Sequence, residues 1–311
     1  MKICFLGAGS LGSTIGGTLS AGGVDVCLVD RWREHVDAIG RDGLAIVEGG
    51  AERIVRVRAQ TDTSNLGVMD FVIVLVKSFH TEEAVRAAEN IIGPETLVMS
   101  LQNGLGNEEA IAGVVGRERV IGGKTYVGGG MLGPGRVSAG VKEKKTVIGE
   151  LDGRISDRIR KIADEFGRAG LETEVSRNIV GTIWDKLLVN VATGAITTIT
   201  GLTYSELYRM EELAETAQAA VAEAVAVARA GGVALDTEDP AEVWRRASAG
   251  LPADFKTSML LGLERGLRSE IDYINGAVVR FGARANVPTP VNETLAACIR
   301  GIERARGIWP I

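Results

Sequence analysis

The start of the chain constrains its fold more than any other stretch. The apolar segment KICFL (residues 2–6) predicts a β-strand, and it leads directly into the glycine-rich loop GAGSLG (residues 7–12). A segment of helix length follows, from Ser10 to Ala21, and a second predicted strand, VDVCLVD, ends on Asp30. A strand, a G-x-G-x-x-G loop, a helix and a strand ending in an acidic residue form the fingerprint of a dinucleotide-binding βαβ unit.

Each glycine of this loop has a separate physical task. Gly7 permits the tight turn, Gly9 lets the backbone approach a pyrophosphate, and Gly12 lets the helix pack closely against the sheet. The phosphates would lie at the N-terminus of the helix, where backbone N–H groups have no partner within the helix. We therefore predict that the whole loop binds the cofactor, through Gly7, Ala8, Gly9, Ser10, Leu11 and Gly12.

Asp30 bears on which cofactor is bound. A carboxylate at this position accepts hydrogen bonds from the ribose hydroxyls of NAD and repels the 2′-phosphate of NADP, so NAD is favoured. Arg31 and Arg33 follow directly and would clamp a 2′-phosphate if the strand ended one residue earlier, so NADP stays possible. We include Arg31 among the predicted cofactor residues, although arginines after a strand are more often solvated loop charges.

Length and charge exclude several classes of protein. A chain of 311 residues corresponds to about two domains. A net charge of −5 with scattered basic residues argues against a nucleic-acid partner. The longest apolar run, Phe71–Val76, is far shorter than the about 20 residues that span a bilayer, so no membrane partner is expected.

Cysteine and histidine are scarce. Three cysteines without CxxC spacing argue against a disulfide framework and are expected to be buried thiols. Two histidines, His35 and His80, leave a zinc site or a histidine-based triad almost without ligands, so no metal is expected. We interpret the N-terminus as part of the fold rather than as a signal peptide, because cleavage would remove the nucleotide loop, and we expect the protein to be cytoplasmic.

The two halves of the chain differ in pattern. In the first half, strand-like runs alternate with helix-like ones, which predicts a parallel, doubly wound Rossmann sheet. Its predicted elements are strands at 71–77, 96–104 and 119–127 and helices from Thr81, from about Asn107 and at 155–170, with GRVSAG (135–140) and KTVIGE (145–150) extending the edge of the sheet.

The second half is rich in Ala, Leu and Glu at helical period and is predicted to be all-α. Its predicted helices cover 178–198, 204–230, 269–282 and 289–306. The fold class is therefore α/β followed by all-α, with a dinucleotide-binding domain at 1–176 and a helical substrate-binding and dimerisation domain at 177–311.

Three stretches of the second half carry a resemblance to a known family: NIVGTIWDKLLVN (178–190), TSMLLGLERG (257–266) and LRSEIDYINGAVVRFGARANVPTPVNETL (267–295). Together with the glycine loop, the strand ending in Lys77 and SLQNGLG (100–106), they resemble the ketopantoate reductase family over nearly the whole chain.

The resemblance implies reduction of a 2-oxo acid, ketopantoate, to (R)-pantoate by hydride from a reduced nicotinamide, as in pantothenate biosynthesis. It also implies the site residues: Lys186 as catalytic lysine, Glu270 as active-site carboxylate, Asn103 and Asn190 as substrate-side amides, Ser258 as substrate-binding hydroxyl, and Lys77, with Asn103, beside the cofactor.

The chemistry agrees with these residue types. Hydride transfer to a ketone leaves charge on its oxygen, which a protonated Lys186 can stabilise and protonate, while Glu270 holds the ammonium. Lys186 and Asn190 are four residues apart and share one face of a helix. Without the resemblance, Lys186 would be interpreted as a surface lysine and Glu270 as an acid favourable to a helix N-terminus.

Two residues depart from the family pattern. Asp30 stands where NADPH-dependent members typically have a basic or neutral residue, and Gly194 stands where the family commonly has a substrate-contacting asparagine, with Thr193 as a partial substitute. These departures indicate an alternative, an NAD-dependent D-2-hydroxyacid dehydrogenase for branched or aromatic 2-oxo acids. A hypothesis of another class is a nucleotide-binding sensor without catalysis. Such a sensor would need none of the four residues that the family resemblance assigns, Lys186, Asn190, Ser258 and Glu270.

Overall fold

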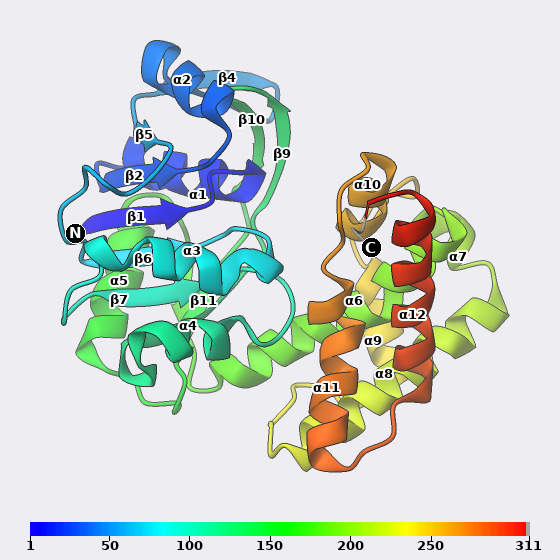
Figure 1. Cartoon of the computed structure of the whole chain (residues 1–311). Helices are drawn as coiled ribbons and strands as arrows, with labels where there is room; N and C mark the ends of the chain where they lie inside the picture. Colours follow the sequence, from blue (N-terminus) through cyan, green and yellow to red (C-terminus); the bar gives the residue numbers. More distant parts are fainter. Residues whose placement is uncertain (309–311) are drawn as a thin grey trace. The chain divides into compact units, whose positions relative to one another are not determined.

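The computed structural model describes residues 1–308 and shows two compact units (Figure 1). The first unit contains Met1–Gln102 and Asn107–Ile179, and the second contains the short loop Asn103–Gly106 and the chain from Val180 onward. The loop therefore belongs to the second unit, although its sequence neighbours on both sides belong to the first.

An eight-stranded sheet forms the centre of the first unit, in the order β12-β11-β8-β7-β6-β1-β2-β5. The strands from β8 to β5 run parallel, whereas β11 is antiparallel to β8 and parallel to β12. The order reverses beside β1, which confirms the predicted doubly wound sheet. The strands are β1 (Lys2–Leu6), β2 (Asp25–Val29), β5 (Arg58–Gln60), β6 (Phe71–Val74), β7 (Leu97–Ser100), β8 (Val120–Thr125), β11 (Thr146–Glu150) and β12 (Thr173–Val175).

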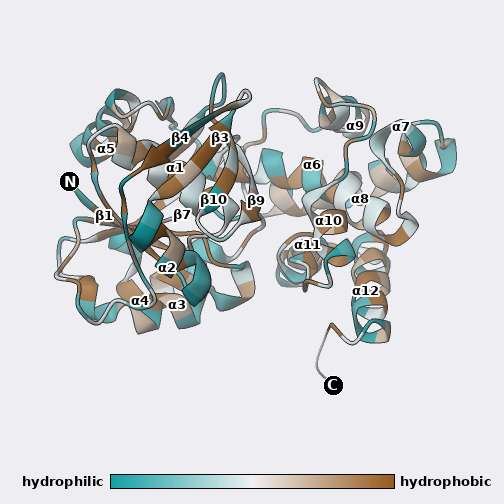
Figure 2. Ribbon diagram, turned by 90° about the horizontal axis from the view of Figure 1, so that it is seen from above, coloured by the Kyte–Doolittle hydropathy of each residue, from teal (hydrophilic) through white to brown (hydrophobic). Residues whose placement is uncertain are grey.

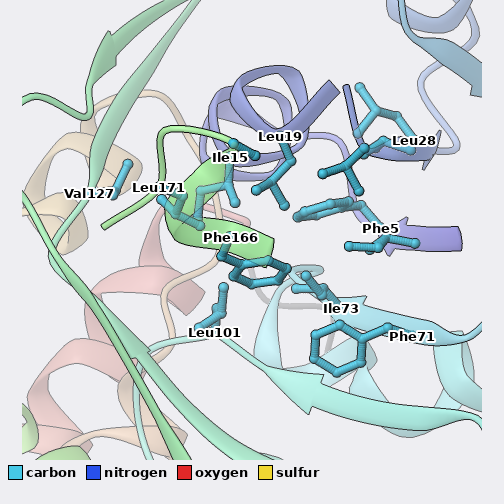
Figure 3. Packing of buried hydrophobic residues seen from close by; sticks show 14 of the residues in the cluster. Phe5, Ile15, Leu19, Leu28, Phe71, Ile73, Leu101, Val127, Phe166 and Leu171 are labelled. Atoms are coloured by element: carbon cyan, nitrogen blue, oxygen red, sulfur yellow. The ribbon is translucent and has the colours of Figure 1, made fainter. Parts of the chain in front are cut away.

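Helices cover both faces of this sheet: α1 (Ser10–Ala21), α3 (Thr81–Ala87), α4 (Asn107–Val115) and α5 (Asp157–Arg168). The side chains of β1 alternate between the faces: Ile3 and Phe5 join the core with α1 and α5, and Leu6 joins the core with α3 and α4. Figure 3 shows the first of these cores, in which Phe71 and Phe166 have ring centroids 6.1 Å apart.

A second sheet of four strands, in the order β4-β3-β10-β9, was not predicted. Its strands are β3 (Leu44–Glu48), β4 (Ala51–Val55), β9 (Gly128–Gly133) and β10 (Arg136–Gly140). The segment GRVSAG therefore does not extend the main sheet, because β10 pairs with β3 and β9 instead. The hairpin between β3 and β4 turns through Gly49 and Gly50, both at positive φ, and two consecutive glycines are a typical hairpin turn signal.

Helix α1 packs against both sheets. A Cβ at Gly16 would lie 2.6 Å from the Leu28 side chain, and a Cβ at Gly17 would lie 2.7 Å from Leu44 and Ile46 of β3. These two glycines therefore permit α1 to approach each sheet closely. Helix α2 (Arg33–Asp42) is mostly hydrophilic, in contrast to strands such as β1 and β3 (Figure 2).

The second unit is helical, and between residues 180 and 308 the structure describes no strand. Its helices are α6 (Ile179–Thr200), α7 (Tyr204–Leu207), α8 (Glu211–Ala230), α9 (Pro240–Ser248), α10 (Ser258–Glu264), α11 (Asn275–Ala285) and α12 (Pro290–Ala305). Within the described chain, α6 alone is long and apolar enough to cross a membrane by length and composition, but 67% of that window is buried, as in a core helix.

Two helices of the second unit differ from the predictions. The single helix expected over 204–230 breaks after α7, where Tyr208 stacks on Trp244 with ring centroids 4.1 Å apart and donates its hydroxyl to the Trp244 carbonyl. The helix expected from Ser269 begins only at Asn275, after a 3-10 turn at Ile271–Tyr273. Helices α9 and α10 were not predicted.

The cysteines are free thiols. Cys4 and Cys27 are buried as predicted, and burial raises the pKa of Cys27 to about 11. Cys298 is exposed, contrary to the prediction, because it lies on the outer face of α12 rather than in a strand of the core.

Candidate active site and cofactor loop

The three loop glycines have distinct surroundings. Gly7 has a φ of +103°, and a Cβ there would lie 2.6 Å from the backbone of Leu75 and Val76. A Cβ at Gly12 would lie 2.0 Å from the carbonyl oxygen of Gly7, so this glycine permits packing of the helix against the loop itself. A Cβ at Gly9 would meet nothing within 4 Å, which leaves open space beside the backbone there.

The N-terminus of α1 fits an anionic group. Its N-cap is Gly9, which has no side chain to cap the first turn, and the N–H of Ser13 closes that turn on the Gly9 carbonyl at 2.9 Å. No acidic residue lies in the first turn. The amides of Ser10 and Leu11 therefore lie at the positive end of a helix dipole beside open space, a suitable site for a pyrophosphate.

Asp30 directly follows β2 and is tied to the loop. Its Oδ2 accepts the backbone N–H of Ala8 at 2.8 Å, and its Oδ1 accepts that of Trp32 at 2.9 Å. Both oxygens keep further lone pairs that hydroxyl groups of a ribose could use. Arg31 forms an exposed ion pair with Glu83 at 2.6 Å.

Two polar residues follow the ends of β6 and β7, the edge where open α/β sheets bind ligands. Lys77 is exposed and begins a 3-10 turn, and Asn103 is half-buried. Directly before Asn103 in the chain is Gln102, a buried amide that sequence reasoning missed: its Nε2 donates to the Val76 carbonyl at 2.7 Å. Gln102 thereby fixes the two strand ends to each other, and only its position next to Asn103 could have indicated this.

Within the second unit, the Asn103 loop is attached to the segment that carries Glu270. The N–H of Leu105 donates to the Tyr273 carbonyl at 2.8 Å, and a Cβ at Gly104 would lie 2.3 Å from that same oxygen. The N–H of Tyr273 in turn donates to the Glu270 carbonyl at 2.9 Å. The structure thus connects Asn103 and Glu270, which lie far apart in the sequence, through a few backbone contacts.

Helix α6 places Lys186 and Asn190 one turn apart, both half-buried, between fully buried apolar neighbours. Ser258 is the exposed first residue of α10. The neighbouring Thr257 caps α10, and its hydroxyl lies 2.8 Å from that of Thr197, which ties the start of α10 to α6.

Gly194 is also on α6. A Cβ at this position would lie 3.6 Å from Cε of Met259, an ordinary contact distance, so a side chain has room to begin here. The hydroxyl of Thr193 is buried, donates to the Val189 carbonyl at 3.1 Å and accepts from the Tyr204 hydroxyl at 3.1 Å. It is thus engaged inside the helical unit, which argues against Thr193 as a substitute for the missing asparagine.

Glu303 supports the Glu270 segment and was also missed from the sequence. It lies in α12, is fully buried, and accepts the N–H of Ser269 at 2.6 Å. Its position on the buried face of an amphipathic helix is the one signal that could have revealed it. Among residues 1–308, no group of three or more His, Cys, Asp or Glu side chains could hold a metal ion.

Two family profiles match this chain, one in its first half and one in its second half. The profile described as "Ketopantoate reductase PanE/ApbA" matches residues 3–153, and its C-terminal counterpart matches residues 178–303. The chain is 35% identical to the 2-dehydropantoate 2-reductase of Pyrococcus horikoshii over 99% of both chains, and 36% identical to that of Archaeoglobus fulgidus over 97% of this chain and 98% of the relative.

Solved structures are similar over the full length. A PanE/ApbA family ketopantoate reductase from Ralstonia eutropha JMP134 has a TM-score of 0.90 and 35% identity, covering 99% of this chain and 100% of that one. A D-mandelate dehydrogenase with NADH and anilino(oxo)acetate has a TM-score of 0.92 and 28% identity, with the same coverage.

Proposed function

Because this chain belongs to the ketopantoate reductase family of oxidoreductases, we propose that it reduces ketopantoate, a 2-oxo acid, to (R)-pantoate with hydride from a reduced nicotinamide. The observation that carries the proposal is the attachment of the Asn103 loop to the Glu270 segment, in the same helical unit as Lys186. We propose that residues 1–176 bind the cofactor and that residues 177–311, together with Asn103, bind the acid.

The nicotinamide, when bound, supplies the hydride. Lys186, as an ammonium group, stabilises the charge that develops on the ketone oxygen and donates a proton to it. Glu270 orients this ammonium and accepts a hydrogen bond from the new hydroxyl. Asn103, Asn190 and Ser258 supply neutral donors that bind the carboxylate and fix the face of the ketone.

The proposed cofactor is NADH in preference to NADPH. Asp30 supports this choice, because backbone N–H groups on either side hold both of its oxygens and place a fixed negative charge where a 2′-phosphate would lie. Arg31, the residue that would offset that charge, already pairs with Glu83. In this proposal, the glycine loop around Gly9 binds the pyrophosphate, and Lys77 also contacts the dinucleotide.

A second candidate is an NAD-dependent D-2-hydroxyacid dehydrogenase for branched or aromatic 2-oxo acids. Gly194 favours it, since the absence of a side chain there removes a polar group from the face that carries Asn190. The similarity to a D-mandelate dehydrogenase solved with NADH supports it as well.

The test is to follow nicotinamide absorbance with NADH or NADPH against ketopantoate, 2-ketoisovalerate and phenylglyoxylate. Preferential turnover of ketopantoate supports the first proposal. Preference for the bulkier acids supports the second, and Gly194→Asn should then shift the preference back towards ketopantoate. Absence of turnover with every acid, despite cofactor binding, contradicts both and favours a sensor.

We also propose a cytoplasmic homodimer formed through the helical unit. Its exposed large hydrophobic side chains support a partner surface on that unit: Ile199, Met210, Leu251, Leu261 and Leu267. Free thiols at all three cysteines support a reducing compartment. Sedimentation velocity of the purified protein tests the dimer directly.

A further inference from the structure

A chain of buried hydrogen bonds connects the second sheet to the cofactor loop through His35. This histidine lies in α2, is fully buried, and stacks on Trp32 with ring centroids 5.1 Å apart. Its Nδ1 lies 2.9 Å from the backbone nitrogen of Gly135, in the turn between β9 and β10. Because a backbone N–H can only donate, Nδ1 must carry no proton.

The other ring nitrogen faces α1. Nε2 of His35 lies 3.1 Å from Oγ of Ser13, and the same Oγ donates to the Ala8 carbonyl at 2.7 Å. The Ser13 hydroxyl has one hydrogen, which it donates to the Ala8 carbonyl. Nε2–H of the imidazole must therefore be the donor to Ser13 Oγ. All these contacts are satisfied together only by the neutral ring with its proton on Nε2.

The chain ends on the peptide that leads into Gly9. Ser13 holds the carbonyl of Ala8, and Asp30 holds the N–H of Ala8, so a side-chain hydrogen bond fixes each of two consecutive peptide planes of the loop. The Ala8 carbonyl and the Gly9 N–H belong to one planar peptide, so fixing the carbonyl also fixes the direction of that N–H. The Gly9 N–H belongs to the loop that would receive the pyrophosphate.

We propose that His35, as the neutral Nε2–H tautomer, is a positioning residue for cofactor binding, acting through Ser13 on the Ala8–Gly9 peptide. The inference rests on the proposed nicotinamide cofactor. It gives the second sheet a function, because the Gly135 turn of that sheet selects the tautomer.

The geometry also makes the hydrogen bond from the Gly135 N–H to His35 Nδ1 sensitive to acid. Protonation would place an N–H on Nδ1 opposite the N–H of Gly135, so that two donors would face each other. Burial lowers the pKa of His35. The charge of Asp30, the ionisable group that acts on the ring from the end of β2, and hydrogen bonding to the Ala8 backbone partly oppose this. Cofactor affinity should therefore fall only at pH values below the ordinary titration range of histidine.

Ser13→Ala is the least disruptive variant that tests this role, since it removes one buried hydroxyl and leaves His35 in place. We expect the Kd for NADH at pH 7.5 to rise roughly threefold to tenfold, the effect of one hydrogen bond. Thr18→Val is the matched control: Thr18 is a buried hydroxyl of the same helix, and it donates within the helix, to Thr14. An equal Kd for Ser13→Ala and the wild type overturns the inference.

His35→Gln and His35→Leu separate positioning from packing. The glutamine side chain offers an acceptor to Gly135 and a donor to Ser13 and does not titrate, so it should keep the affinity at neutral pH and abolish the loss in acid. The leucine variant should bind NADH weakly at every pH. Equal affinity and equal pH dependence of the glutamine variant, the leucine variant and the wild type overturn the inference.

The tautomer of His35 can be measured by NMR spectroscopy without any cofactor. The chain has two histidines, so in a His80→Gln background the ¹⁵N imidazole signals belong to His35 alone. A neutral Nε2–H ring supports the proposal, and an Nδ1–H ring or a cationic ring at pH 7.5 overturns it. Failure of the wild type to bind either nucleotide would contradict the proposed function and this inference together, whereas tight binding by both wild type and Ser13→Ala overturns only the inference.

Discussion

The backbone N–H of Ala8 donates to Oδ2 of Asp30 at 2.8 Å, so a direct hydrogen bond joins the acid at the end of the second strand to the glycine loop at the end of the first. Asp30 therefore does more than present a negative charge to a ribose. It also shapes the loop that receives the phosphates, which links cofactor choice to loop geometry.

Asp30→Asn should change cofactor preference. The amide keeps one acceptor oxygen but loses the charge, so we expect NADH affinity to fall about tenfold, the value of a charge-assisted hydrogen bond, and NADPH affinity to improve. The ratio of kcat/KM for the two cofactors measures this, with the exposed Asp37→Asn in α2 as control. An unchanged ratio would show that Asp30 does not select the cofactor.

Gly9→Ala and Gly12→Ala should affect different properties, NADH affinity in the first case and the free energy of unfolding in the second. Gly9→Ala meets no atom within 4 Å, so the protein should fold normally but bind NADH several-fold more weakly, because the methyl group occupies the space proposed for the pyrophosphate. Gly12→Ala would place its Cβ 2.0 Å from the Gly7 carbonyl and should lower the free energy of unfolding by about 1–3 kcal/mol. Urea unfolding and NADH titration distinguish the two, and normal NADH affinity in Gly9→Ala would contradict the placement of the phosphates.

Lys186→Ala should reduce kcat roughly 10²- to 10⁴-fold, the usual contribution of a general acid. The Kd for NADH should not change, because Lys186 is in the helical unit, whereas the glycine loop and Asp30 are in the first unit. Lys161→Ala, an exposed lysine of α5, is the control for loss of one positive charge. If Lys186→Ala kept full activity, another group would have to supply the proton.

Asp185→Asn should stabilise the protein at neutral pH. The Asp185 carboxylate accepts the N–H of Asp236, and burial raises its pKa from 3.8 to about 6. A raised pKa means that the folded state binds the proton more tightly, so the free energy of unfolding falls as the pH rises from 4 to 6. Allowing for solvent screening of this half-buried group, the asparagine should add about 1 kcal/mol at pH 7.5 and less towards pH 4, measured by urea unfolding.

Glu303→Ala should destabilise the helical unit. It leaves the buried N–H of Ser269 without its acceptor, which costs about 1–3 kcal/mol, and it should lower kcat because Ser269 directly precedes Glu270. Glu303→Gln keeps an acceptor and should lose less. The exposed Glu215→Ala in α8 of the same unit should change neither quantity, and equal stability of the alanine and wild-type proteins at position 303 would contradict this role.

Local patterns in the sequence predicted the elements that depend on local contacts. Helix α1 begins at Ser10 and ends at Ala21 as expected, because the glycine loop and the apolar spacing specify it without distant partners. The family resemblance supplied the roles of Lys186 and Glu270, which no spacing rule gives. The predicted helix over 204–230 failed because the contact of Tyr208 with Trp244, which turns the chain, is not visible in local spacing.

The sequence by itself determined the dinucleotide loop, the alternation of strands and helices in the first half, the helical second half and the family. Only the tertiary structure decided which distant segments meet: β3 with β10, His35 with Gly135, Leu105 with Tyr273, and Glu303 with Ser269. The physical reason is that periodicity and glycine chemistry act between neighbouring residues, whereas these contacts gain their energy only after two separate segments have folded and packed.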